Sequence, residues 1–305
     1  MTRLWVARPE LADAVADLPG AAVDLYDGGA EPASLDEVEF YVPVLLPSPA
    51  SLEIMARMPR LRVVQLQTAG FEHALPHLPP GVTLCNARGA HDAGTAEWAV
   101  GAALASLREF PRFAAAQREG RWDYRQTAAL ADSRVLLVGY GSIGQAVERR
   151  LAPFEVEITR VASRPREGVH GVADLPDLVP HADVIILLVP ATPSTKGLVD
   201  AALLARMKDG ALLVNAARGP VVDTDALVAE TATGRIRAAL DVTDPEPLPP
   251  DHPLWRAPGV FVTPHVAGST TASVRRVARL VRDQARRYLA GEPLRHVQAG
   301  PGDPP

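Results

Sequence analysis

The stretch Arg134-Val135-Leu136-Leu137-Val138-Gly139-Tyr140-Gly141-Ser142-Ile143-Gly144 decides the fold of this chain. An apolar run of strand length meets three glycines in the spacing G-x-G-x-x-G, and residues 145–151 continue with the apolar spacing of a helix. The first glycine permits the tight turn, the second lets a pyrophosphate approach the backbone, and the third lets helix and strand pack closely. The phosphates would then meet the positive end of the helix dipole. A lone motif of this kind can be an ordinary glycine turn, but here it predicts a dinucleotide site.

Short apolar runs and helical stretches alternate on both sides of this motif, which predicts parallel sheets with helices on both faces. Beyond the glycines we expect strands at 156–161, 183–188, 211–215, 238–242 and 260–263, and helices at 201–207, 224–231 and 270–290. Before them we expect strands at 4–7, 22–26, 40–46, 63–67 and 83–86, and helices at 12–18, 51–58 and 95–109. The expected fold is α/β, with two doubly wound, Rossmann-like or flavodoxin-like domains.

The length of 305 residues is comfortable for two domains, and only the second half carries phosphate-binding glycines. We therefore expect a flavodoxin-like substrate-binding domain in residues 1–95 plus 270–305, because the final helix returns to the first domain. A dinucleotide-binding Rossmann domain is expected in residues 96–269. Two crossings between these domains would leave an active-site cleft between them.

Composition excludes several classes of function. A net charge of −5 and a pI near 5.9 give no electrostatic footprint for nucleic acid or an anionic membrane. The longest apolar stretches, such as residues 184–189, are far short of the roughly 20 residues that a membrane helix needs. Cys85, the single cysteine, cannot form an intrachain disulfide, and the start lacks the apolar core of a signal peptide. We expect a cytoplasmic protein.

The strand after the glycine loop bears on the choice of cofactor. A site for NAD usually places an Asp or Glu at the end of this strand, where the carboxylate binds the ribose 2′-hydroxyl. Here the strand ends in Ala162-Ser163-Arg164-Pro165-Arg166, which has no acid. Ser163 and Arg164 could bind a 2′-phosphate through charge-assisted hydrogen bonds, although basic loops are often merely solvated. The sequence favours NADP, with NAD as the alternative.

Three polar side chains follow strand ends on the cofactor side: Arg218, Glu246 and His265. Each is flanked by small, Pro or Gly residues, which pin a side chain that must be aimed. Any one alone has a plain explanation, because an Arg in a glycine turn is often an anion tether and a His after Pro a capping residue. Their conjunction behind one dinucleotide fold favours catalysis. No set of metal ligands is expected.

The chain resembles the D-isomer-specific 2-hydroxyacid dehydrogenase family from the loop at 67–71 to the terminal helix. The motifs that carry the resemblance are Gly139 to Gly144, Asn215-Ala216-Ala217-Arg218-Gly219, Asp241 to Glu246, His252-Pro253-Leu254-Trp255, and Thr263-Pro264-His265-Val266-Ala267-Gly268. The departure from the common pattern is the acid missing at residues 162–164.

The resemblance implies a role for each residue of these motifs. Arg218 would bind the substrate carboxylate and polarise the 2-oxo group, His265 would donate the proton, and Glu246 would support His265. Independently of the resemblance, the loop at 67–71 follows a strand end, so the backbone N–H groups of Ala69 and Gly70 could hold a carboxylate, with a plain surface turn as the equal alternative. Implied cofactor contacts are Thr95, Gly139, Gly141, Ser142, Ile143, Gly144, Val189, Pro190, Ala216, Asp241 and Gly268.

The chemistry of these groups agrees with the reduction of a small 2-oxo acid to a D-2-hydroxy acid, or the reverse. Histidine suits a proton transfer near neutral pH, and a neighbouring carboxylate favours its protonated form. The planar fork of an arginine matches a carboxylate, and its charge stabilises the developing alkoxide. The resemblance makes glyoxylate or hydroxypyruvate candidate substrates, and the hydride belongs to the cofactor.

Two other kinds of protein share parts of this pattern. Corepressors that resemble the same family keep similar motifs but act as cofactor-sensing, non-catalytic binding proteins. An amino acid dehydrogenase would need a lysine near the substrate, and the chain has only Lys196 and Lys208. We also expect a homodimer through the cofactor domain, because the helix at 95–109 has a broad apolar face of small residues.

Overall fold

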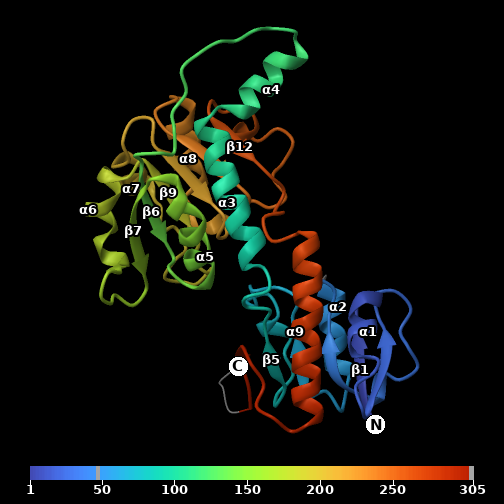
Figure 1. The fold of residues 1–305 in the computed structure, drawn as a ribbon. Helices are drawn as coiled ribbons and strands as arrows, with labels where there is room; N and C mark the ends of the chain where they lie inside the picture. The colour runs from blue at the N-terminus through green and yellow to red at the C-terminus, as the bar shows by residue number, and fades with distance from the viewer. Residues whose placement is uncertain (46–48, 302–305) are drawn as a thin grey trace. The chain divides into compact units, whose positions relative to one another are not determined.

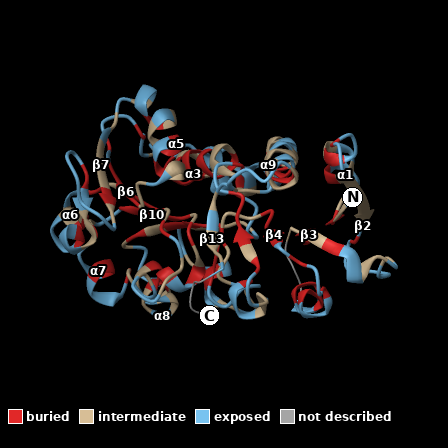
Figure 2. Ribbon diagram, turned by 90° about the horizontal axis from the view of Figure 1, so that it is seen from below, coloured by how far each residue is buried: buried red, intermediate tan, exposed pale blue. Residues whose placement is uncertain are grey.

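The computed structural model describes residues 1–45 and 49–301. The chain divides into two compact units, which we treat separately (Figure 1). Unit 1 comprises Met1–His91 and Thr271–Pro305, and unit 2 comprises Asp92–Thr270. In both units the buried residues concentrate in the strands and in the helix faces turned toward them (Figure 2).

Unit 2 is built on a sheet of seven parallel strands. They are β6 (Arg134–Val138), β7 (Glu157–Ala162), β8 (His170–Gly171), β9 (Val184–Leu187), β10 (Leu212–Asn215), β11 (Arg237–Leu240) and β12 (Val260–Val262). Their order is β12-β11-β10-β9-β6-β7-β8, so the chain starts in the middle and winds outward in both directions. This is the strand order of a doubly wound dinucleotide-binding sheet, with β12 added at one edge. The predicted α/β fold class is confirmed.

Helices cover both faces of this sheet, because alternate apolar side chains of each strand point to opposite faces, as β6 shows. Val135 and Leu137 pack with α3 (Asp92–Leu107) and α5 (Ser142–Leu151), whereas Leu136 and Val138 belong to the core on the opposite face. All four side chains are buried, as expected for a strand covered on both sides. The opposite face carries α6 (Leu175–Leu178), α7 (Ala201–Ala205) and α8 (Thr224–Ala232). Short 3-10 helices are η4 (Ala152–Phe154), η5 (Val172–Asp174), η6 (Val179–His181), η7 (Gly219–Val221) and η8 (Pro253–Trp255).

Two helices of unit 2 were not expected from the sequence, the short α6 and the helix that follows α3. Glu109 adopts a left-handed conformation with a φ of 53°, which ends α3, and α4 (Phe110–Arg118) begins directly after it. Pro111 predicts the end of a helix when only the sequence is considered. It lies in the first turn of α4, however, where proline is well tolerated. Figure 1 shows α4 and the loop after it extending away from the sheet of unit 2.

Unit 1 has a sheet of six strands. They are β1 (Thr2–Val6), β2 (Ala21–Leu25), β3 (Val38–Val42), β4 (Val63–Gln65), β5 (Thr83–Cys85) and β13 (Val297–Ala299), in the order β13-β5-β4-β3-β1-β2. The five parallel strands have the flavodoxin-like order, and β13 pairs antiparallel with β5. β13 is too short to leave a pattern in the sequence. The strand expected at 40–46 ends at Val42, and its last residue, Leu46, lies outside the described residues.

The helices of unit 1 also divide between two faces. Leu4 and Val6 of β1 pack with α1 (Pro9–Val15) and α9 (Thr271–Leu289), while Trp5 packs on the other side with Met55. The remaining helices are α2 (Pro49–Glu53), η1 (Leu35–Glu37), η2 (Ile54–Arg57) and η3 (Leu75–His77).

Candidate active site

His265 is held in a strained loop just beyond the carboxyl end of β12. Its φ of 53° lies in the left-handed region, which a non-glycine residue adopts only where its surroundings enforce it. The His265 N–H donates to the carbonyl oxygen of Asp241 at 2.8 Å. The imidazole Nδ1 lies 2.6 Å from Glu246 Oε1. The hydrogen bond from His265 lowers the pKa of Glu246, so this carboxyl is ionised and orients the ring.

Asp241 directly follows β11 and fixes the loop that contains His265. Its carboxylate is buried and accepts hydrogen bonds from Thr263 Oγ1 at 2.6 Å, the Val266 N–H at 2.9 Å and the Ala267 N–H at 2.8 Å. Both carboxylate oxygens are therefore engaged within the protein. The motif alone did not reveal this clamp, although a buried carboxylate next to a loop of exposed N–H groups is a general way to hold such a loop.

Arg218 follows β10 at the same edge of the sheet. Asn215 fixes its backbone, because Asn215 Oδ1 accepts from the Ala217 N–H at 3.0 Å and Asn215 Nδ2 donates to the Arg218 carbonyl at 3.1 Å. A Cβ on Gly219 would lie 1.9 Å from the carbonyl oxygen of Thr243, so only glycine allows the two loops to touch. The half-buried Arg218 also helps to lower the pKa of Glu246 through its charge, after the larger effect of His265.

The strand order explains how three distant segments meet. β10, β11 and β12 are neighbours in the sheet and parallel, so their carboxyl ends lie at one edge. Arg218 follows β10, Asp241 and Glu246 follow β11, and His265 follows β12. The structure thus brings Glu246 and His265 into contact and places Arg218 close enough to influence the charge of Glu246.

The glycine loop lies at the carboxyl end of β6, where the winding of the sheet reverses between β6 and β9. Gly139 has a φ of 111°, and a Cβ there would lie 2.6 Å from the carbonyl carbon of Leu188. A Cβ on Gly144 would lie 2.5 Å from the carbonyl oxygen of Gly139. A Cβ on Gly141 would meet nothing within 4 Å, which leaves space at the N-terminus of α5. These residues fit a bound dinucleotide pyrophosphate.

The other residues expected at the cofactor occupy varied places in unit 2. Ser142 Oγ donates to Asp92 Oδ1 at 3.3 Å at the start of α5, next to Ile143. Thr95 is buried in α3. Val189 and Pro190 follow β9, Ala216 follows β10, and Gly268 lies in the loop after β12. Lys208 is occupied elsewhere, because its Nζ bonds to Asp183 Oδ1 at 2.7 Å just before β9 begins.

The turn after β7 contains the basic residues expected at the adenosine end of the cofactor. Ser163 and Arg164 are both exposed. Arg166 is anchored, because its Nη2 donates to the Tyr140 carbonyl at 3.2 Å and its guanidinium lies 5.6 Å from the centre of the Tyr140 ring. Glu167, the next residue, adds an exposed carboxylate to the turn that the sequence interpretation overlooked.

In unit 1, the loop after β4 contains the expected carboxylate-binding N–H groups. Asn86 Nδ2 donates to the Ala69 carbonyl at 2.7 Å, and Thr68 Oγ1 donates to the Gly70 carbonyl at 2.6 Å. These bonds fix the loop through its carbonyl groups. Within residues 1–45 and 49–301, the N–H groups of Ala69 and Gly70 have no hydrogen-bond acceptor, so they are free to bind an anion.

Two kinds of feature are absent from the part of the chain that the structure describes. It contains no group of three or more His, Cys, Asp or Glu side chains that could hold a metal ion. None of its helices is both long enough and apolar enough to cross a membrane.

Comparison with known proteins gives consistent matches. Residues 100–267 match the family model of the D-isomer specific 2-hydroxyacid dehydrogenase NAD-binding domain. A glyoxylate reductase of Thermofilum pendens is 35% identical over 263 residues, covering 81% of this chain and 78% of that protein. The human glyoxylate reductase/hydroxypyruvate reductase is 33% identical over 248 residues, covering 77% of this chain and 76% of that protein.

Solved structures match over nearly the whole chain. A D-isomer specific 2-hydroxyacid dehydrogenase from Xanthobacter autotrophicus, solved with NADPH and MES, is 31% identical with a TM-score of 0.82 and covers 98% of both chains. The NADPH-dependent glyoxylate/hydroxypyruvate reductase of Sinorhizobium meliloti, solved with citrate, is 26% identical with a TM-score of 0.84 and covers 99% of both chains.

Proposed function

Because this chain belongs to the D-isomer specific 2-hydroxyacid dehydrogenase family, we propose that it reduces glyoxylate, hydroxypyruvate or a similarly small 2-oxo acid, with NADPH preferred over NADH. It is an NAD(P)-dependent oxidoreductase that acts on the CH–OH group of its donor. The observation that carries the proposal is the His265–Glu246 pair, held at the same edge of the sheet as Arg218 and the glycine loop.

This geometry supports a proposed role for each of these residues. The bound cofactor supplies a hydride to carbon 2 of the substrate. Glu246 holds Nδ1 of His265, so the other ring nitrogen, Nε2, is the one that carries the proton to the substrate oxygen. Arg218 binds the substrate carboxylate through its planar fork and stabilises charge on the oxygen. The Ala69 and Gly70 N–H groups supply further donors for the carboxylate.

The NADPH preference rests on the turn after β7. Ser163 and Arg164 are exposed there and can bind a 2′-phosphate, and no acidic residue stands at the end of the strand itself. The match to an NADPH complex and to an NADPH-dependent reductase supports the proposal. Glu167 opposes the preference for NADPH, because its exposed carboxylate repels a 2′-phosphate.

The proposed homodimer through the cofactor domain is supported by the segment after α4 rather than by α3. The apolar face of α3 packs within unit 2, since Ala96, Ala99 and Ala103 all belong to its core. By contrast, Trp122 is 94% exposed and Tyr124 is 89% exposed in the segment after α4. Large aromatic side chains left in water favour burial against a partner. A monomeric mass by light scattering at micromolar concentration would contradict this proposal.

The remaining proposals concern compartment and partners. A cytoplasmic location is supported by the single, buried thiol of Cys85, which a reducing compartment keeps free. The net charge of −5 gives no reason to propose a nucleic-acid partner. A non-catalytic, corepressor-type role is not favoured, because the matched proteins are reductases.

A panel of 2-oxo acids assayed with NADPH and NADH tests the proposed function directly. We expect turnover of at least one acid of two or three carbons, with a larger kcat/KM for NADPH. Binding of NADPH without turnover of any 2-oxo acid would favour the non-catalytic alternative.

A further inference from the structure

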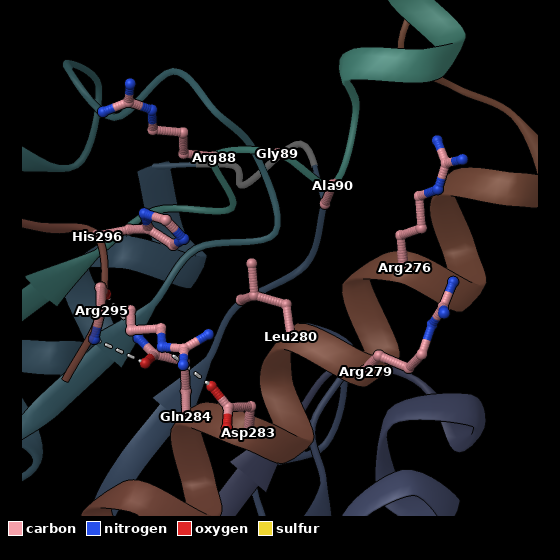
Figure 3. A pocket seen from close by; sticks show the side chains of 10 residues that line it. All are labelled: Arg88, Gly89, Ala90, Arg276, Arg279, Leu280, Asp283, Gln284, Arg295 and His296. Atoms are coloured by element: carbon pink, nitrogen blue, oxygen red, sulfur yellow. Dashed lines mark hydrogen bonds and ion pairs between the residues drawn. The ribbon is translucent and has the colours of Figure 1, made fainter. Parts of the chain in front are cut away.

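A cavity in unit 1 is lined largely by arginines and takes no part in the proposed reaction. Its volume is about 390 Å³, and its walls are the segment after β5, one side of α9 and the segment before β13. Figure 3 shows Arg276 and Arg279 rising from α9, Arg88 across the hollow from them, and Leu280 between. Arg295 and His296 complete the lining from a third segment.

The charges around this cavity are unbalanced. Arg88, Arg276 and Arg279 form no ion pair with any acidic side chain within residues 1–45 and 49–301. Asp283 is the one carboxylate among the lining residues, and it is already bonded to Arg287, with Nε and Oδ2 2.9 Å apart. Among the residues that line the cavity, Asp283 has Arg295 as its neighbour, with Arg295 Nε 3.6 Å from Asp283 Oδ2. The cavity therefore carries a net positive charge in a chain whose net charge is −5.

Three other arginines of the same helix are neutralised, whereas Arg275 is exposed and forms no ion pair among the described residues. Arg282 pairs with Asp17, Arg286 pairs with Glu292, and Arg287 pairs with Asp283. The unpaired Arg276 and Arg279 line the cavity, whereas the unpaired Arg275 does not. Like charges gathered around one hollow repel one another, and an anion between them would relieve that repulsion.

The backbone that presents these arginines is fixed. Gln284 is buried, and its Oε1 accepts from the Arg295 N–H at 2.9 Å while its Nε2 donates to the Arg295 carbonyl at 2.8 Å. Its Nε2 also donates to Gln65 Oε1 in β4, at 2.9 Å. On the opposite wall, the Arg88 N–H donates to Asn86 Oδ1 at 3.2 Å. Only the side chains need to adjust when a ligand binds.

We propose that this cavity is a binding site for a small anion with two or more negative charges, borne on phosphate or carboxylate groups. The guanidinium groups lie apart from one another and do not converge on one point (Figure 3), so a ligand with separated charges fits better than a single-charged ion. Leu280 offers an apolar contact for the middle of the ligand. The site is independent of the proposed function, because all its residues belong to unit 1 and none is placed in the reaction.

The test is isothermal titration of the full chain with inorganic pyrophosphate and, separately, with citrate, at constant ionic strength. Saturating NADP⁺ is present throughout, so that the glycine loop is not available to the phosphate. We compare wild type with Arg276→Gln/Arg279→Gln and with Arg88→Gln. Arg275→Gln is the matched control, because Arg275 is an exposed neighbour on α9 that does not line the cavity.

We expect at least one of the two anions to bind wild type and Arg275→Gln equally. Arg88→Gln should weaken binding about tenfold, the usual effect of losing a charge-assisted hydrogen bond, and the double variant should weaken it further. Pyrophosphate binding would identify phosphate groups as the preferred chemistry, and citrate binding would identify carboxylates. Failure of both anions to bind wild type would overturn the proposal. So would equal losses in Arg275→Gln and the cavity variants, since the binding would then reflect general charge.

Discussion

His265 Nδ1 lies 2.6 Å from Glu246 Oε1, and the histidine that makes this contact has a left-handed backbone conformation. The strain is maintained from two directions. Asp241 fixes the backbone on either side of the imidazole, and Glu246 fixes the ring itself. The imidazole of His265 is therefore held in one orientation, and proton transfer requires such a fixed orientation.

Glu246→Gln should lower kcat at neutral pH by about 10- to 100-fold, the effect of losing one hydrogen bond between charged groups. It should also change the pH dependence of stability. The bond from His265 lowers the pKa of Glu246 below that of an ordinary glutamate, so the pair stabilises the fold above the ordinary pKa and loses this effect as pH falls through the lowered pKa. Thermal unfolding across pH should therefore show wild type and variant converging in acid.

The control for this change is Asp244→Asn. Asp244 lies in the same loop and is exposed, and the substitution removes the same charge without touching His265. Equal losses of kcat in the two variants would mean that loop charge, and not the bond to the imidazole, is responsible.

His265→Gln should reduce kcat by about 10²- to 10⁴-fold, the usual contribution of a general acid. The affinity for NADPH should not change, because the glycine loop and the turn after β7 are separate from this loop. Fluorescence titration with NADPH and steady-state kinetics measure the two effects. Turnover at the wild-type rate would exclude His265 from the reaction.

Arg218→Lys should impair the enzyme severely although it keeps the charge. An ammonium group cannot form the two parallel hydrogen bonds by which a guanidinium holds a carboxylate. We expect kcat/KM for the best 2-oxo acid to fall about 10-fold or more, since a charge-assisted bond is lost. Near-normal kcat/KM would contradict the assigned role of Arg218.

Gly219→Ala should damage both stability and activity. Its added methyl group would stand 1.9 Å from the Thr243 carbonyl oxygen, so the loops that carry Arg218 and Glu246 must separate. Overpacking of this kind costs about 1–3 kcal/mol. Gly101→Ala is the matched control, because Gly101 lies in α3 with nothing within 4 Å of a Cβ, and it should gain about 0.5–1 kcal/mol. Urea unfolding of both variants measures the difference, and equal effects would show that the close approach is unimportant.

The sequence predicted the sheets of both units well because their strands are continuous apolar runs. β6 and β9 are buried on both faces, and such runs are unmistakable next to glycine turns. The doubly wound α/β class was also predicted, whereas the order of the strands became known only from the structure. The short strands β8 and β13 and the helices α4 and α6 were missed, since elements of two to four residues leave no period and α4 buries only Ala116.

The residues of the candidate site could be predicted from the sequence, but the contacts that hold their loops in place could not. Strand ends gave Arg218, Glu246 and His265, because parallel neighbours finish at one edge. The clamp by Asp241 depends on which backbone N–H groups face a buried carboxylate, and no spacing encodes that. The anchoring of Arg166 on Tyr140 likewise joins two loops 26 residues apart.

The preference for NADPH depends on few residues, and the structure distinguishes between them. Arg166 is committed to the Tyr140 carbonyl and ring, whereas the side chain of Arg164 is exposed and makes no ion pair among the described residues. Arg164 is therefore the guanidinium available to a 2′-phosphate, and one charge-assisted bond is enough for about tenfold discrimination. Glu167, in the same turn, repels that phosphate and should weaken the preference.

Arg164→Ala should therefore raise the KM for NADPH about tenfold while leaving the KM for NADH and kcat nearly unchanged. Glu167→Gln should act in the opposite direction and lower the KM for NADPH. Arg149→Ala removes an equal charge from the exposed side of α5 and serves as the control. It distinguishes direct binding of the 2′-phosphate from the effect of the overall electrostatic potential of unit 2. The measurement is kcat/KM for both cofactors on all four proteins. If wild type prefers NADH, or if Arg164→Ala and Arg149→Ala behave alike, the arginines of this turn are solvated surface and the assignment of NADPH is wrong.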